Sequence, residues 1–95
     1  MAEYDGYHGI HTAVGWPTAT LITWYPVTPR AAYLRVRATT CQCSQIFYEF
    51  CIGGGLYFIR RYDRTGARTT LTETEWRHRR LMEELWQRIL NGEAR

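Results

Sequence analysis

The chain has 95 residues, an ordinary share of aliphatic and aromatic side chains, and a net charge of +3. This length excludes a second buried core, so we expect one domain over residues 1–95. No apolar run approaches the roughly 20 residues that span a bilayer, and residues 1–5 are acidic where a secretory signal is basic. We therefore expect a cytoplasmic protein without membrane contact.

Residues 1–30 are predicted to be irregular apart from one strand. Glycines and aromatic residues are scattered through this segment without a sustained period. Residues 18–25 (TATLITWY) are rich in β-branched and aromatic side chains, which favours a strand. Pro26 and Pro29 restrict their own backbone and that of the preceding residue, so a turn or linker is expected there.

Residues 31–71 are predicted to form an antiparallel sheet. Apolar and polar side chains alternate in its first strand, which is typical of a half-buried strand. Gly53, Gly54 and Gly55 supply the positive φ angles of a tight hairpin, and Asp63 with Gly66 indicates a second turn. The predicted strands cover residues 32–40, 45–52, 56–62 and 67–70.

A C-terminal helix is predicted over residues 72–92. Thr72 and Glu75 fit a capping box, in which the threonine caps the helix and the glutamate reaches back. Gly92 lies where a glycine commonly ends a helix. One face of the helix carries the side chains expected to be buried: His78, Leu81, Met82, Leu85, Trp86 and Ile89.

These elements predict an α+β fold, an antiparallel β-meander of four to five strands with one C-terminal amphipathic helix packed on one face. Centring the glycine hairpin on Gly54 pairs Tyr48 with Arg60, and the preceding turn pairs Tyr48 with Arg37. The face expected under the helix carries Leu34, Val36, Ala38, Phe47, Cys51, Tyr57 and Ile59. The opposite face carries Tyr33, Arg35, Arg37, Ile46, Tyr48, Phe50, Ile52, Phe58, Arg60 and Tyr62.

The rings and guanidinium groups of this second face are the candidate binding residues: Tyr33, Arg35, Arg37, Tyr48, Phe50, Phe58, Arg60 and Tyr62. We call this set the aromatic–arginine face. Aromatic rings on an open sheet stack on the bases of single-stranded nucleic acid while arginines hold phosphates. From Arg30 onward the chain has twelve arginines and seven acids, which suits a polyanion. A GC-rich genome, whose codons favour arginine, explains the abundance of arginine as well, and a solvated surface explains the positive charge equally well.

Two other roles for the aromatic–arginine face remain open. Residues 1–30 can fold over it and make it a second core, or it can be the contact of a homodimer or of a protein partner, since interfaces are enriched in aromatics and arginine. The predicted function is a small non-catalytic accessory or regulatory binding module for nucleic acid, with protein interaction or homodimerisation as the alternative.

The cysteines and histidines give no complete catalytic or metal motif. Three cysteines cannot close a tetrahedral zinc site, and an odd count argues against a disulfide framework. Cys41 and Cys43 are spaced to bind a soft metal or to act in redox chemistry, and Cys51 is expected far from them along the strand. His8 and His11 lie three residues apart but among glycines. We therefore expect no metal, cofactor or catalytic residue, with a small metal or redox protein as the least favoured alternative.

Several segments of the second half resemble small proteins of high-GC actinobacteria to which no function is attached. The resemblance rests on residues 47–50 (FYEF) and 54–61 (GGLYFIRR), and on Thr72, Trp76 and residues 85–90 (LWQRIL). It covers about half of the chain. It implies a β-hairpin followed by a C-terminal helix, and no activity.

Overall fold

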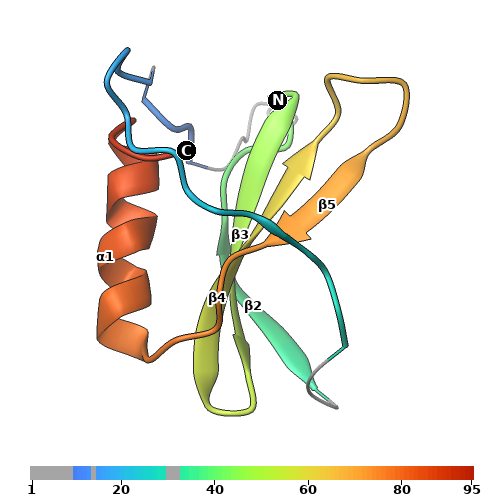
Figure 1. Cartoon of the computed structure of the whole chain (residues 1–95), viewed down its shortest axis with the longest axis vertical. Helices are drawn as coiled ribbons and strands as arrows, with labels where there is room; N and C mark the ends of the chain where they lie inside the picture. Colours follow the sequence, from blue (N-terminus) through green and yellow to red (C-terminus); the bar gives the residue numbers. More distant parts are fainter. Residues whose placement is uncertain (1–9, 14, 30–32) are drawn as a thin grey trace, which may run out of the picture.

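The computed structural model describes residues 10–13, 15–29 and 33–95, and in this part of the chain it contains five strands and one helix (Figure 1). The strands form one antiparallel sheet in the order β1-β5-β4-β3-β2. Strands β2 to β5 follow one another as a meander, so the predicted α+β fold is confirmed. The elements are β1 (Tyr25–Pro26), β2 (Leu34–Thr39), β3 (Ile46–Gly53), β4 (Leu56–Asp63), β5 (Thr70–Glu73) and α1 (Arg79–Leu90).

Helix α1 packs against one side of the sheet, which we call the helix side (Figure 1). The ring of Phe50 in β3 lies 5.5 Å from the ring of Trp86 in α1, and Met82 and Ile89 are buried beside them. The apolar stripe of α1 therefore packs as its periodicity predicts. The buried cluster consists of Tyr48, Phe50, Ile59, Met82, Trp86, Ile89 and Ala94.

The opposite side of the sheet, which we call the outer side, is covered in part by two pairs of stacked aromatic rings. Phe58 of β4 stacks on Trp76, which follows β5, with centroids 4.1 Å apart and planes within 3° of parallel. Phe47 of β3 stacks on Tyr62 of β4 at 4.5 Å. Phe58 and Cys51 are fully buried as a result. The sheet thus has an apolar layer on both sides.

The glycine hairpin differs from its predicted register by one residue. Gly54 and Gly55 both have positive φ angles, 58° and 79°, and form a two-residue turn. This turn pairs Phe50 with Ile59 and Glu49 with Arg60, where a turn centred on Gly54 would pair Phe50 with Phe58. A slip of one residue exchanges the two faces of a strand. The predicted faces of the β4 residues are therefore confirmed, with Tyr57 and Ile59 on the helix side, whereas those of β3 are wrong: Tyr48 and Phe50 lie on the helix side, and Phe47 and Cys51 on the other.

Strand β2 also departs from its predicted pairing. Arg35 pairs with Ile52 instead of Phe50, and the ladder shifts between Val36 and Ala38, so that Arg37 lies in a β-bulge. An extra residue on one strand leaves that residue without a cross-strand partner and bends the strand. Arg37 consequently does not pair with Tyr48 as the turn geometry predicted.

The helix begins seven residues later than predicted. Residues expected to cap it form β5, where Glu73 pairs with Arg60 and Thr72 with Arg61. His78 is the N-cap and its ring nitrogen accepts from the Leu81 amide at 3.5 Å, so His78 is exposed and not on the buried face. Sheet pairing of a threonine-rich segment therefore outweighs the local capping signal at Thr72.

The predicted strand over residues 18–25 is reduced to β1, and Pro26 lies in that strand instead of in a linker. The preceding residues bond to the C-terminal tail: the Thr20 amide donates to the Glu93 carbonyl and the Ile22 amide to the Arg95 carbonyl, at 2.9 and 2.7 Å. Residues 20–26 cross from the end of α1 to β5 (Figure 1). This segment, the strap, brings Trp24 to 5.9 Å from the ring of Tyr48 and completes the helix-side core.

Candidate functional site

The structure divides the residues of the aromatic–arginine face among three environments. Tyr48 and Phe50 lie under α1 and the strap, and each is only 6% exposed. Phe58 lies on the outer side and is fully buried beneath Trp76. A ring without exposed surface cannot stack on a base, so these three residues do not form a nucleic-acid platform.

Two further members of the aromatic–arginine face, Tyr62 and Arg60, contact Glu49 in a polar network on the outer side of the sheet. The Tyr62 hydroxyl donates to Oε1 of Glu49 at 2.9 Å, and the Arg60 guanidinium lies 3.8 Å from the same oxygen. Burial, and then the hydrogen bond to Glu49, raise the pKa of Tyr62. Arg60 also lies over the Phe58 ring at 5.7 Å. These contacts occupy Arg60, which was predicted to hold a phosphate, and Tyr62, which was predicted to stack on a base.

The remaining members lie at β2 and are exposed. Tyr33, just before the strand, is 85% exposed, and Arg35 and Arg37 are exposed as well. The sequence placed Leu34 and Val36 of the same strand in the core, but they are 41% and 50% exposed. Five consecutive residues therefore offer one ring, two guanidinium groups and two aliphatic side chains to solvent.

The position of β2 explains this exposure. Leu34–Thr39 pairs with β3 on one edge; on its other edge no further strand is paired among the described residues, and Ile10 bridges Thr40 just beyond its end. Leu34 and Val36 pair with Gly53 and Cys51 and hence lie on the outer side, while Arg35 lies on the helix side opposite Ile52. An edge strand presents outward-pointing N–H and C=O groups to an added strand. We call the exposed residues 33–37 with this backbone edge the β2 edge.

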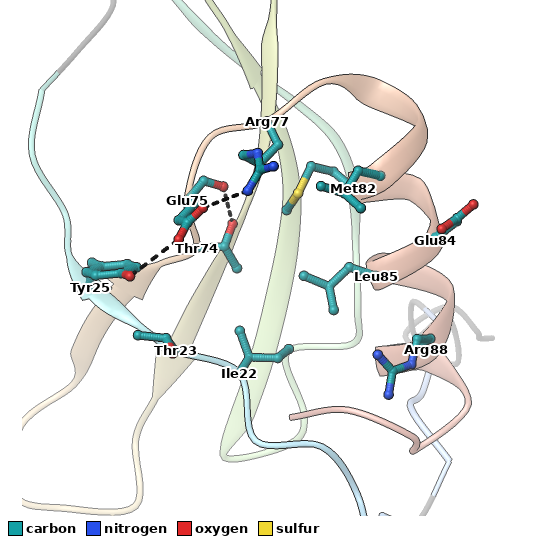
Figure 2. Close-up of a pocket in the computed structure, with 11 residues that line it drawn as sticks. Ile22, Thr23, Tyr25, Thr74, Glu75, Arg77, Met82, Glu84, Leu85 and Arg88 are labelled. Atoms are coloured by element: carbon teal, nitrogen blue, oxygen red, sulfur yellow. Dashed lines mark hydrogen bonds and ion pairs between the residues drawn. The ribbon is translucent and has the colours of Figure 1, made fainter.

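A pocket of about 330 Å³ lies between the strap, the end of β5 and helix α1 (Figure 2). Ile22, Met82 and Leu85 are among its apolar lining, and charged side chains stand around them. Two of these charges are already paired, because Arg77 lies 2.9 Å from a carboxylate oxygen of Glu75. The full lining is Ile22, Thr23, Tyr25, Thr74, Glu75, Arg77, Leu81, Met82, Glu84, Leu85 and Arg88.

Two other rim groups of the pocket, Tyr25 and Arg88, also have partners. The Tyr25 hydroxyl donates to Glu75 at 3.5 Å, and Arg88 donates to the Thr20 hydroxyl at 2.8 Å. Figure 2 shows Tyr25, Glu75, Thr74 and Arg77 linked in one chain across the strap and the segment after β5. A pocket of this size admits a small apolar group. Its polar groups stabilise the contact of the strap with the body of the protein.

Two cysteines and a histidine form the remaining chemical cluster. Sγ of Cys41 and Sγ of Cys43 are within hydrogen-bond distance, 3.1 Å apart, and Nε2 of His11 lies 3.7 Å from Sγ of Cys43. The hydrogen bond with Cys41 raises the pKa of the Cys43 thiol. The sequence indicated the two cysteines as a pair, but nothing in it pointed to His11 as their neighbour.

Comparison with known proteins finds no match for the chain. No family model matches it, and it matches no curated protein and no solved structure. The resemblance to actinobacterial proteins therefore stays a prediction. In the described residues, helix α1 has 12 residues, fewer than the roughly 20 that span a bilayer, and no membrane-crossing helix is found there.

Proposed function

We propose that the protein is a small binding module that takes an extended acidic segment of a partner protein along the β2 edge. The observation that carries this proposal is the exposure of Tyr33, Leu34 and Val36, at 85%, 41% and 50%, beside exposed arginines on a strand at the edge of the sheet. Aromatic residues and arginine are enriched at protein interfaces. An edge strand binds such a segment through main-chain hydrogen bonds, with side chains giving specificity.

The alternation of β2 favours a particular kind of segment. Leu34 and Val36 lie on the outer side and Arg35 on the helix side. Side chains that face one another across two paired strands share a side of the sheet. A partner strand that alternates apolar and acidic residues therefore places its apolar groups beside Leu34 and Val36 and its carboxylates beside Arg35.

Charge favours a partner over a second copy of the chain. The sequence has no acidic residue from Tyr33 to Tyr48, whereas it has Arg35 and Arg37. Two β2 strands paired across a dimer axis would bring four guanidinium groups together with no carboxylate from either strand. Like charges on opposed strands destabilise the pairing. The same arginines attract a carboxylate-bearing strand.

Burial also favours a protein segment over nucleic acid. Of the four rings in the aromatic–arginine face that were expected to stack on bases, Tyr48, Phe50 and Phe58 are buried and Tyr62 is bound to Glu49. Tyr33 is the member of the original set that offers a fully accessible ring. Single-stranded nucleic acid is held by successive stacked bases, and the β2 edge has aliphatic side chains where such rings would be needed. The non-catalytic role and the cytoplasmic location expected from the sequence stay predictions.

The test is a fluorescence anisotropy titration with labelled peptides. One peptide alternates valine and glutamate, and its matched control has glutamine at each glutamate position. We expect the glutamate peptide to bind about 3- to 30-fold more tightly, as two exposed ion pairs of ~0.3–1 kcal/mol each would give. An oligothymidylate strand is titrated in parallel as the nucleic-acid probe.

Two charge reversals locate the contact. Arg35→Glu should abolish the preference for the glutamate peptide, whereas Arg68→Glu, in the exposed turn before β5, should retain it within about twofold. Equal losses in both variants would mean general charge attraction and would sink the proposal. Tighter binding of oligothymidylate, weakening by ~0.7 log units per phosphate contact for each decade of salt, would establish the nucleic-acid function instead. A stable dimer in sedimentation would establish self-association.

A further inference from the structure

Three side chains with nitrogen or sulfur ligand atoms meet beside the turn between β2 and β3. They are Cys41 and Cys43 from the turn and His11 from the N-terminal segment, thirty residues before Cys41. Their ligand atoms all lie within 4.8 Å of one another. Convergence of such groups from separate segments is what a metal site requires, because neighbouring residues alone rarely surround an ion.

Backbone contacts hold the two segments together independently of any ion. Ile10 and Thr40 form a parallel bridge, and the Cys41 amide donates to the Ile10 carbonyl at 2.9 Å. The Thr40 hydroxyl accepts from the Tyr48 amide, also at 2.9 Å, which fixes the end of β2 to β3. His11 therefore follows a residue that is anchored directly beside the first cysteine.

The turn itself is braced from the other side. Arg64, after β4, donates to the carbonyl oxygens of Gln42 and Ser44. The Cys43 amide donates to Sγ of Cys41 at 3.4 Å, so the backbone folds around the first sulfur. A preorganised turn reduces the conformational entropy lost when both sulfurs bind one ion.

The distances are close to those of a zinc site. Zinc binds cysteine sulfur at about 2.3 Å and histidine nitrogen at about 2.0–2.1 Å, so tetrahedral ligands lie ~3.6 Å (N to S) and ~3.8 Å (S to S) apart. The Nε2 of His11 and Sγ of Cys43 are already 3.7 Å apart. The two sulfurs, at 3.1 Å, must separate by less than an ångström, and Cys43 is exposed and able to turn.

We propose that His11, Cys41 and Cys43 bind one zinc ion, and among residues 10–13, 15–29 and 33–95 no fourth protein ligand joins them, so solvent can take that position. Cys41 is 5% exposed and forms the base of the site, while Cys43 and His11 are exposed and leave its outer side accessible. Two cysteines and a histidine with an open position are a ligand set used by zinc enzymes. The site replaces the expectation that the chain holds no metal.

Bound zinc would link the N-terminal segment to the sheet. The loop from His11 to Cys41 contains the strap and β1, and the ion closes this loop at its two ends. Metal that binds only the folded chain stabilises it. Zinc is therefore expected to raise the melting temperature of the protein as well as to occupy the site.

The experiment is a titration of the reduced full-length protein with cobalt(II), followed by displacement with zinc(II). It is run with a phosphine reductant at mildly alkaline pH, because the thiols must lose their protons to bind the ion. We expect one ion per chain, thiolate-to-cobalt charge transfer in the near ultraviolet, and the intense visible bands of tetrahedral cobalt. Zinc should remove both signals and raise the melting temperature.

Exposed ligands allow variants that keep the fold. Cys43→Ser and His11→Ala should each lower zinc affinity by more than about 100-fold, since even groups that only orient a ligand cost 10–100-fold. Gln42→Ala, which changes the side chain between the two cysteines, and His78→Asn, which keeps a helix cap, should bind as the unmodified protein does. Circular dichroism without metal confirms that each variant is folded.

Three results would overturn the zinc site. The first is absence of cobalt bands at micromolar protein and equimolar metal. The second is undiminished binding by His11→Ala, which would reduce the site to the cysteine pair. The third is loss of the cobalt spectrum in Cys51→Ala, since Cys51 is fully buried on the outer side of β3 and has no place in the cluster.

Discussion

Strands β2 (LRVRAT) and β3 (IFYEFCIG) are neighbours, yet they are buried to opposite extents. Phe47, Tyr48, Phe50 and Cys51 of β3 are buried, two on each side of the sheet. In β2 every residue is exposed except Ala38, which is half-buried. The comparison shows that burial follows the position of a strand in the sheet. Alternation alone does not distinguish a central strand from an edge strand that is available to a partner.

The largest effect that the comparison predicts is on the stability of the central strand. Phe50→Ala removes a ring that packs 5.5 Å from both Trp86 and Tyr57, and should lower the free energy of unfolding by about 3–5 kcal/mol. Urea denaturation followed by tryptophan fluorescence measures this as a lower midpoint with an unchanged slope. A loss below about 1 kcal/mol would mean that the helix-side core does not depend on β3.

A second prediction concerns pH and the other side of the same strand. Burial raises the pKa of the Cys51 thiol from 9.0 to about 11. The unfolded chain therefore ionises first, and the stabilisation present below pH 9 is lost as the pH rises toward about 11. The free energy of unfolding should fall by about 2–3 kcal/mol across this window.

The control for this pH effect is Cys51→Ala, which removes the titrating thiol. Denaturation of both proteins at a series of pH values gives the free energy of unfolding at each pH. The slope of this free energy against pH is then compared between the two proteins. Tyr62, whose pKa is also raised, remains in both proteins and cancels in the comparison. Identical slopes for the two proteins would contradict the assignment to Cys51.

The smallest effect is expected at the edge strand. Val36→Ala shortens a side chain that is 50% exposed, and should change the free energy of unfolding by no more than about 0.5 kcal/mol. The same urea denaturation measures it. A loss above about 2 kcal/mol would show that β2 is packed as tightly as β3 and would remove the contrast between the two strands.

Much of the fold could be predicted because it depends on local patterns. Alternation indicated β2, the glycine hairpin and the turn after Asp63 delimited β3 and β4, and the spacing of Met82, Trp86 and Ile89 indicated the buried face of the helix. The predicted start of the helix was wrong because Thr72 and Glu73 pair with β4. A local capping pattern does not reveal such an interaction between separate segments.

The candidate site was harder to predict because it depends on the pairing register of the strands and on which strand lies at the edge of the sheet. The turn consists of Gly54 and Gly55 instead of being centred on Gly54. This shift of the turn pairs Phe50 with Ile59 instead of Phe58, and hence changes which aromatic rings lie on the same side of the sheet. Leu34 and Val36 read as core residues by alternation, but they lie at the edge of the sheet. The contact of His11 with Cys43 joins residues 32 positions apart, so only the folded chain brings them together.

The most direct test of the central claim is to map the bound glutamate–valine peptide on the isotopically labelled protein by NMR. If the β2 edge is the binding surface, the backbone amides of Leu34–Thr39 should show the largest shifts, and those of Arg79–Leu90 should stay nearly unchanged. Shifts concentrated in α1 and the strap, around the pocket, would contradict the claim.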